Sequence, residues 1–395
     1  MRAVRQLNLL LCALGLSACQ RCSDERKPAP KAVPLPTELD VPLSKGLTLP
    51  AREQRDSATG IGLPPACRIA LPLHALSIGS RDVVFTSTRR QLSRLAILER
   101  STDPVASAVY DFATGAAAPS PWLDASAPPP ADFFADQWAY GMTRVAEGSV
   151  TAAAFWRAEA GAAFRVAGDQ LQIADVACSD EDCAMLTTIA RNTKAPGATL
   201  TWLSKPGSVD VAPEGDSDWE PLGILQVEAD RGRAKVALHA PTRLQTWTVA
   251  AEGAALERSI DTPHGVYDAV QAARVLVLSP GLPPTKPCQE GGFPIQVHAD
   301  GEKRAPIRAS GPPDGVIARA LGRGSVVAWV APASCRLIEQ RIVGLALLDA
   351  EGRQVGSTMT VTEAKGFALA SDGSRLALWL RTREHIVHLT AECSL

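Results

Sequence analysis

Six cysteines between residues 67 and 393 have the number and spacing best suited to chemistry, and that chemistry is disulfide formation. They are Cys67, Cys178, Cys183, Cys288, Cys335 and Cys393. Six thiols allow fifteen pairings, so the connectivity stays open. Zinc binding is the alternative for Cys178 and Cys183, but they lack C-x-x-C spacing and have no neighbouring histidine.

Local geometry favours a Cys178–Cys183 pair. The two residues flank a four-residue acidic turn, and facing hairpin positions lie within disulfide reach. Two further pairs are expected, Cys288–Cys335 and Cys67–Cys393. The last pair would join the two ends of the folded body, and closing so long a loop contributes on the order of 5 kcal/mol.

Histidine and serine patterns do not indicate a catalytic centre. The six histidines are scattered, and the closest pair is His385 and His388. On a strand, residues three apart point to opposite faces, so these two cannot share a metal ion. No G-x-S-x-G nucleophile elbow occurs. We therefore predict no catalytic residues, no enzymatic activity and no cofactor.

Two acidic segments are candidate cation sites. Residues 179–182 carry three acidic groups, and residues 214–220 carry four. Asp216, Asp218 and Glu220 would be the ligands of a weak Ca²⁺ site. An EF-hand pattern is missing, and loops this acidic are usually only solvated, so no metal is predicted.

An aromatic cluster is the candidate for partner binding. Phe133, Phe134, Trp138 and Tyr140 follow three consecutive prolines, in a stretch with the composition of a loop. Exposed aromatic side chains of this kind contact proteins or glycans. The alternative is an aromatic plug packed between structural units.

The first residues have the pattern of a secretory signal. Arg2 and Arg5 precede the apolar residues 9–16, and small residues follow. This apolar run is too short to span a bilayer, which needs about 20 helical residues.

The sequence Leu16-Ser17-Ala18-Cys19 resembles the lipobox of bacterial lipoproteins. The resemblance implies that Cys19 becomes the first mature residue and carries acyl chains on its sulfur and amine. Two or more chains anchor a protein stably. Gln20, in place of an aspartate, implies the outer membrane, with the body facing the periplasm. The alternative is an ordinary signal in which Cys19 is incidental.

Charge excludes some partner classes. The formal net charge is −2, without blocks of Lys or Arg, so no nucleic-acid site and no polybasic membrane patch is expected. The expected partners are the membrane, through the N-terminal lipid, and an envelope protein or glycan.

We expect three segments along the chain. Residues 1–18 form the signal, residues 19–64 a mostly disordered proline-rich tether, and residues 65–395 the folded body. Proline-rich chain is extended, and this tether would reach up to roughly 100 Å. The alternative is that the C-terminal part of 19–64 packs back on the body as an extra strand.

A strand–turn–strand phrase recurs seven times in the body, as short apolar runs separated by polar or glycine turns. The copies span residues 75–85, 142–152, 174–186, 225–238, 266–278, 316–329 and 367–380. A second hairpin phrase follows some copies, at residues 108–115, 295–301 and 345–352. Two hairpins per repeat make a four-stranded sheet.

This repeat resembles the blades of β-propellers. The resemblance implies an all-β fold, a single propeller of about seven four-stranded blades, without the WD or kelch signatures. Residues 66–71 would close the ring beside residues 387–393. The alternative is two β-sandwich domains.

The sequence favours a lipid-anchored envelope protein that uses a propeller as a binding scaffold, without catalysis. One alternative is a secreted propeller hydrolase or lyase that acts on a glycan or peptide. Another is a structural envelope lipoprotein with no specific ligand.

Overall fold

The computed structural model describes most of the chain from residue 37 onward. The described residues are 37–39, 45–55, 62–87, 91–99, 106–119, 138–144, 150–157, 162–167, 172–178, 182–188, 197–202, 207–213, 219–228, 231–280, 292–334, 337–362 and 364–395. All 31 named elements in them are β-strands. None of the described residues forms a helix long and apolar enough to cross a membrane. The chain divides into Met1–Pro34 and Leu35–Leu395, and all strands of the described residues belong to the second unit.

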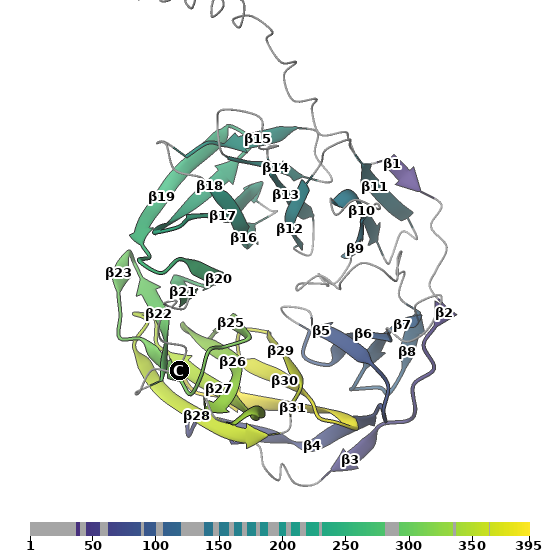
Figure 1. The fold of residues 1–395 in the computed structure, drawn as a ribbon. Helices are drawn as coiled ribbons and strands as arrows, with labels where there is room; N and C mark the ends of the chain where they lie inside the picture. Colours follow the sequence, from purple (N-terminus) through teal and green to yellow (C-terminus); the bar gives the residue numbers. More distant parts are fainter. Residues whose placement is uncertain are drawn as a thin grey trace, which may run out of the picture. The chain divides into compact units, whose positions relative to one another are not determined.

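The strands form seven sheets arranged as blades around one axis (Figure 1), and all but one of their strand pairs are antiparallel. Blade 1 contains β5 (Val83–Ser87), β6 (Arg94–Glu99), β7 (Ala106–Asp111) and β8 (Ala117–Pro119). Blade 2 contains β9 (Trp138–Arg144), β10 (Val150–Arg157) and β11 (Ala162–Ala167). Blade 3 contains β12 (Gln172–Cys178), β13 (Cys183–Thr188), β14 (Ala198–Trp202) and β15 (Ser208–Val211). Blade 4 contains β16 (Glu220–Glu228), β17 (Arg233–Ala240), β18 (Arg243–Ala250) and β19 (Gly253–Asp261).

The last three blades complete the ring. Blade 5 contains β20 (Val266–Ala272), β21 (Val275–Pro280), β22 (Phe293–Ala299), β23 (Glu302–Lys303) and β24 (Ile307–Ala309). Blade 6 contains β25 (Gly315–Leu321), β26 (Gly324–Ser334), β27 (Leu337–Leu348) and β28 (Gln354–Thr362). Blade 7 contains β29 (Gly366–Ser371), β30 (Arg375–Arg381), β31 (His385–Cys393) and, from the other end of the chain, β4 (Cys67–Ser77). The predicted seven-bladed β-propeller is confirmed.

The repeated phrase matches the blades in six of its seven copies. Each of those six falls on the two innermost strands of a sheet, as residues 367–380 do on β29 and β30. Residues 75–85 do not follow this pattern, because β4 belongs to blade 7 and β5 begins blade 1. The chain passes from one blade to the next here, since the N-terminal part of the body completes the last sheet.

Each seam between blades is filled by apolar side chains from both neighbours. In β30, Leu378 lies in the cluster shared with blade 6, while Ala377 and Trp379 lie in the cluster shared with blade 1. Successive residues of a strand point to opposite faces. A strand sandwiched between two blades is therefore apolar on both faces, as its sequence shows.

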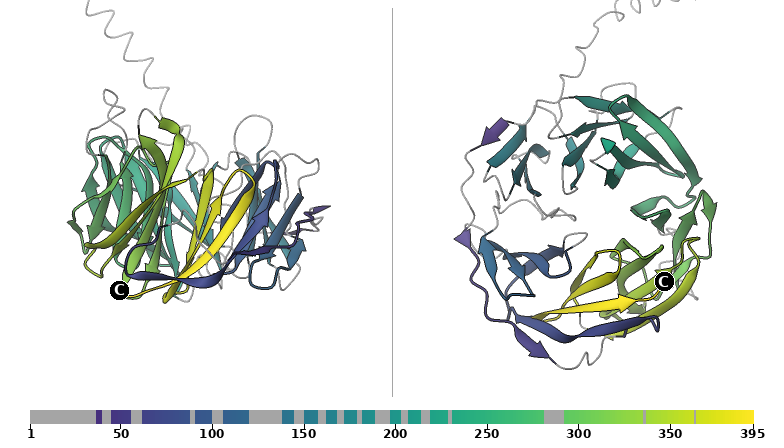
Figure 2. Two further views of the ribbon diagram at one scale, coloured as in Figure 1. Left: turned by 90° about the horizontal axis from the view of Figure 1, so that it is seen from below. Right: turned by 180° about the vertical axis from the view of Figure 1, so that it is seen from behind.

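The segment expected to be a tether contributes strands to the body. β1 (Thr37–Leu39) pairs with β11, β2 (Lys45–Gly46) with β7, and β3 (Glu53–Arg55) with β4. These three strands lie on the outer side of blades 2, 1 and 7 (Figure 2). The expected boundary after residue 64 is therefore too late, because the outer strands of these blades take up the preceding chain.

We call residues 37–39, 45–55 and 62–65, which include β1–β3, the arm. It continues from blade 7 to blade 6, where the Gly62 amide donates to Thr360 Oγ1 at 2.9 Å. Two of its leucines pack in the seams between blades. Leu47 is buried in the cluster between blades 7 and 1, and Leu63 packs on the cluster between blades 6 and 7.

Candidate functional site

The innermost strands of the blades line the inner edge of the ring, where side chains from several blades can meet. β5, β12, β16, β20, β25 and β29 each end their sheet, toward the ring axis (Figure 1). On one edge, each of these strands has no neighbouring strand in its own sheet, so the backbone N–H and C=O groups of that edge need other partners. Polar side chains on these strands can either pair with those groups or converge on a ligand.

Asp175 on β12 pairs with the next blade. Its Oδ2 accepts a hydrogen bond from the backbone N–H of Ile224 on β16, at 2.6 Å. The neighbouring Gly223 leaves room for the carboxylate, because a Cβ there would lie 2.9 Å from Asp175 Oδ2. This carboxylate ties blade 3 to blade 4.

Three further inner-strand side chains make the same kind of tie. Arg319 Nε on β25 donates to the carbonyl of Leu369 on β29 at 3.1 Å. Ser87 Oγ on β5 donates to the same carbonyl, also at 3.1 Å. Ser371 Oγ on β29 donates to the carbonyl of Ala320 at 2.7 Å. These polar groups hold blades 6, 7 and 1 together.

Within the described part of the chain, no three His, Cys, Asp or Glu residues gather as a metal site. The charged residues of β12 and β25, Asp175 and Arg319, both hydrogen bond to backbone of a neighbouring blade. Such an arrangement stabilises a rigid ring.

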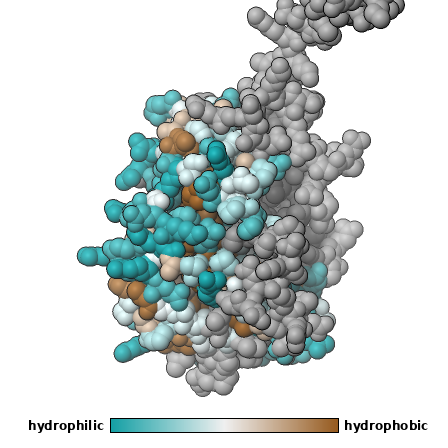
Figure 3. All heavy atoms as spheres, turned by 60° about the vertical axis from the view of Figure 1, so that its left-hand side comes forward, coloured by the Kyte–Doolittle hydropathy of each residue, from teal (hydrophilic) through white to brown (hydrophobic). Residues whose placement is uncertain are grey.

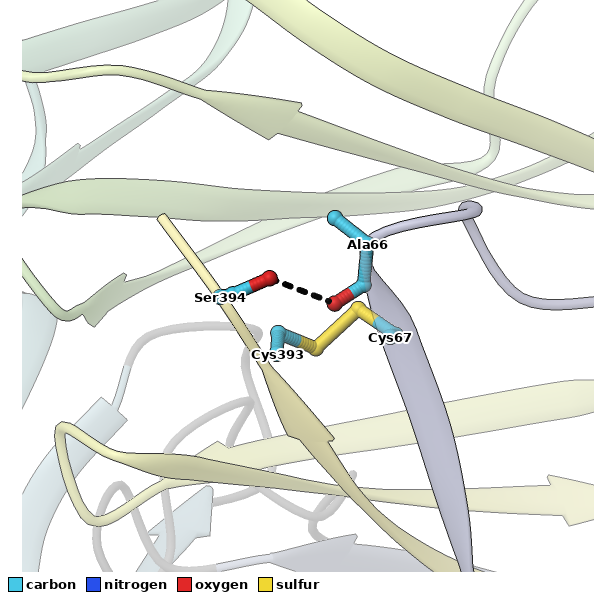
Figure 4. The surroundings of a disulfide bond; sticks show 4 residues. All are labelled: Ala66, Cys67, Cys393 and Ser394. Carbon is cyan, nitrogen blue, oxygen red and sulfur yellow. Dashed lines mark hydrogen bonds between the residues drawn. A yellow bond between two sulfur atoms is a disulfide. The ribbon is translucent and has the colours of Figure 1, made fainter.

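The ring is closed by a disulfide between Cys67 on β4 and Cys393 on β31 (Figure 4). The two residues face each other in the antiparallel ladder, with Cα atoms 4.0 Å apart. Beside the disulfide, the Ser394 amide donates a hydrogen bond to the carbonyl of Ala66 at 3.0 Å and extends the pairing of the two chain ends. The predicted Cys67–Cys393 pair and the predicted closing strand are confirmed.

A row of stacked rings crosses blade 7 on its three central strands. Trp379, His388 and His74 are cross-strand neighbours on β30, β31 and β4. The centroids of Trp379 and His388 are 5.0 Å apart, and those of His388 and His74 are 6.0 Å apart. Phe112 of blade 1 packs on His388 at 4.9 Å.

His388 is the polar link of this row to blade 1. Its Nε2 lies 2.7 Å from the carbonyl of Leu92, so Nε2 carries the proton and donates. Nδ1 is buried and has no hydrogen-bond partner among the described residues. Burial lowers the pKa of His388 to about 4, and burial also lowers the pKa of His74. Both rings are therefore neutral at pH 7.

From the sequence, no chemistry was assigned to His388, and no sequence pattern predicts this hydrogen bond. A histidine among apolar strand residues is the available signal. The acceptor is a backbone carbonyl nearly three hundred residues away, and no side-chain motif marks it.

The other predicted cysteines are described in part. Cys178 and Cys183 face each other in the ladder of β12 and β13, and Cys183 is disulfide-bonded. Cys288 and Cys335 lie outside the described residues, as does the lipidation candidate Cys19.

Of the three candidate calcium ligands, the structure describes Glu220. Glu220 is the exposed first residue of β16 and faces His239 in the ladder. Asp216 and Asp218 lie outside the described residues.

The aromatic cluster differs from its predicted loop. Trp138 and Tyr140 lie on β9, the innermost described strand of blade 2, because this aromatic stretch takes up pairing with β10. Phe133 and Phe134 lie outside the described residues.

No protein-family model and no curated protein matches this sequence. Among solved structures, a prolyl endopeptidase is similar in fold, with 12% identity and a TM-score of 0.51 over 76% of this chain. The match covers 45% of that chain, so this protein spans less than half of it. A chain of the mitotic checkpoint complex matches over 85% of this chain and 97% of its own length, with 11% identity and a TM-score of 0.46. At such identities the likeness concerns the fold alone.

Proposed function

We propose that this chain is an envelope protein held at the membrane by acyl chains on Cys19, and that its propeller is a non-catalytic binding scaffold. The observation that supports the scaffold role is that polar side chains of the innermost strands hydrogen bond to neighbouring blades. Asp175 and Arg319 hydrogen bond to backbone of the next blade, which makes the ring rigid. Rigid platforms present binding residues on their connecting segments.

The arm shortens the proposed tether. Only about 18 residues separate Cys19 from Thr37, where β1 begins. Fully extended chain spans about 3.3 Å per residue, which gives a reach of roughly 60 Å. The proposed anchor therefore keeps the propeller closer to the bilayer than an unstructured 19–64 segment would.

The proposed docking residues are the aromatic cluster Phe133, Phe134, Trp138 and Tyr140. Trp138 and Tyr140 belong to the innermost described strand of blade 2, and Phe133 and Phe134 immediately precede it in the sequence. Aromatic side chains supply most of the binding energy in many interfaces. The proposed partner is an envelope protein or glycan.

Metabolic labelling with an alkyne fatty acid tests the anchor. The wild type should incorporate label, Cys19→Ala should lose it, and Cys22→Ala should keep it. Cys22 is the matched control because it lies three residues away in the same segment. Label that persists in Cys19→Ala would overturn the lipid anchor.

Crosslinking in intact envelopes tests the scaffold. Phe133→Ser/Phe134→Ser should lose a specific crosslinked partner, whereas Leu256→Ser, at an exposed apolar residue of blade 4, should retain it. An identical crosslinking pattern in both variants contradicts the proposed docking residues. Steady turnover of peptide or glycan substrates by the purified protein would contradict the non-catalytic role and favour a hydrolase.

A further inference from the structure

The seam between blades 4 and 5 holds two polar side chains among its apolar residues. Leu244 of β18 and Leu276 of β21 belong to the apolar cluster of this seam. Thr246 lies two residues after Leu244, and His298 of β22 faces Leu276 in the ladder. Strand residues two apart share one face of the sheet, and so do residues paired across a ladder. Both polar side chains therefore lie on the faces that border this seam.

Both polar groups are almost completely buried. Thr246 is 2% exposed and His298 is 5% exposed. Thr246 Oγ1 and His298 Nε2 have no hydrogen-bond partner in the part of the chain that the structure describes. Buried polar atoms of proteins are nearly always hydrogen-bonded, and a hydroxyl and a neutral imidazole can each donate. The seam therefore offers two buried donors to a group that accepts hydrogen bonds.

Two cations lie on the outer side of the same seam, one from each blade. Arg258 of β19 is the cross-strand neighbour of Thr246, and Lys303 of β23 is the cross-strand neighbour of His298. Directly opposed side chains of a ladder have Cβ atoms about 5 Å apart. β19 and β23 are the outer strands of their blades and lie next to each other (Figures 1 and 2). We call these four residues, Thr246, Arg258, His298 and Lys303, the seam site.

The electrostatics of His298 agree with this placement. Burial lowers the pKa of His298, and the charges of Lys303 and Arg258 lower it further. Lys303 belongs to the same blade as His298, whereas Arg258 belongs to the blade across the seam. Cations from both sides of the seam therefore act on one buried ring.

The carboxylates next to the two cations already have partners. Glu257, on which Arg258 also acts electrostatically, pairs with Lys235 Nζ at 2.9 Å. Glu302 pairs with Arg304 at 2.6 Å. Among the described residues, neither cation of the seam site has an ion-pair partner of its own. The seam site therefore carries positive charge that no described carboxylate neutralises.

We propose that the seam site binds a phosphate group, which accepts hydrogen bonds from Arg258 and Lys303 on its outer side and from the two buried donors inside. Guanidinium and ammonium groups bind phosphate oxygens through charge-assisted hydrogen bonds. Four donors on four strands suit an anion with four oxygens, whereas a carboxylate offers only two. The ligand is either a free phosphate ion or the phosphate ester of a larger molecule. This site is separate from the proposed lipid anchor and from the aromatic cluster.

Isothermal titration of the full chain with inorganic phosphate tests the site. The wild type should show one saturable site, and Arg258→Gln/Lys303→Gln should weaken binding about tenfold or more, because charge-assisted hydrogen bonds are lost. The control Arg243→Gln/Arg274→Gln also removes one exposed charge from each of blades 4 and 5, and it should bind as the wild type does. No saturable heat, or equal weakening in both variants, would overturn the proposal and leave internal water as the partner of the buried donors.

A second titration distinguishes the two forms of the ligand. Glycerol 3-phosphate carries the phosphate as an ester, as a lipid headgroup does. If it binds more tightly than inorganic phosphate and depends equally on Arg258 and Lys303, the site takes an esterified phosphate. If the inorganic ion binds more tightly, the site takes free phosphate. Binding of either probe that the double variant leaves unchanged contradicts the seam site.

Nuclear magnetic resonance of the histidine rings reports on the buried side of the site. Bound phosphate should shift the ring signals of His298 and raise its pKa, because the anion offsets the two neighbouring cations. The signals of His264, an exposed turn residue of blade 4, should stay in place. Phosphate that binds without moving the His298 signals would be an adventitious ion only, and that result would overturn the proposal.

Discussion

Blades 7 and 4 protect their outer edges in different ways. In blade 7, β4 buries Leu73 and Leu76, and its outer edge pairs with β3 of the arm. In blade 4, β19 is mostly exposed, and within the described residues no strand covers it. Figure 3 shows that this side of the ring is largely hydrophilic, with scattered apolar residues.

Charged residues protect the open edge of β19, whereas β3 covers the edge of β4. Glu257 of β19 pairs with Lys235 Nζ at 2.9 Å and accepts a hydrogen bond from Thr248. These contacts lower the pKa of Glu257 against the opposing effect of burial. Charged residues on an edge strand discourage pairing with other chains. An apolar strand at an edge needs a cover, whereas a charged strand can remain open.

The largest expected effect comes from removing the Cys67–Cys393 disulfide of blade 7. Cys67 and Cys393 are 326 residues apart in sequence, and closing so long a loop stabilises the fold by about 5 kcal/mol. Cys67→Ser/Cys393→Ser should lower the free energy of unfolding in urea by that order. Cys178→Ser/Cys183→Ser is the control, and its short loop should cost only about 2 kcal/mol. Equal losses would contradict the importance of ring closure.

The second-largest expected effect is a loss of folding stability in acid, caused by protonation of His388 in blade 7. The pKa of His388 is about 4 in the fold and about 6.5 when unfolded, so the unfolded chain binds the proton more tightly. The contribution of neutral His388 to the free energy of unfolding is therefore fully present above about pH 6.5. It falls by about 3 kcal/mol as pH drops toward 4.

His388→Gln separates this term from general acid effects. Glutamine retains an N–H donor for the Leu92 carbonyl but does not titrate, so its urea midpoint should depend less on pH between 7 and 4. His264→Gln, at an exposed turn residue, should keep the slope of the wild type. Identical slopes in all three proteins would exclude His388 as the source.

Matched leucines compare the covered edge with the open one directly. Leu47 of the arm is 7% exposed and Leu256 of β19 is 49% exposed. Leu47→Ala should cost about 2–3 kcal/mol because it empties part of the seam, whereas Leu256→Ala should cost less than about 0.5 kcal/mol. Thermal or urea unfolding measures both. A cost at Leu256 as large as that at Leu47 would invalidate the comparison.

The smallest effect is expected at the charged edge. Glu257→Gln removes a partly exposed ion pair with Lys235, worth about 0.5 kcal/mol of stability. Its clearer consequence should be a greater tendency of blade 4 to associate, since the edge loses a charge. Light scattering at rising concentration detects this. A variant that unfolds early without associating would argue for a structural role instead.

Sequence reasoning succeeded where a pattern is local and repeated. Residues 376–380 are apolar at every position, which predicted a strand buried on both faces, and β30 is such a strand. It failed at residues 75–85, because the spacing of the two strands does not reveal that they belong to different blades. The sequence offered strand pairing within residues 19–64 only as an alternative, for a related reason. The two- and three-residue strands of the arm have no periodicity, and they exist only because blade edges lie beside them.

The sequence by itself determined the all-β class and the blade repeat, because alternation and turn residues act over short distances. The tertiary structure alone decided which strands share a blade, where the arm lies, that Cys67 pairs with Cys393, and that His388 hydrogen bonds to the Leu92 carbonyl. Those contacts join residues far apart in the chain, and their energy depends on burial that no local pattern records.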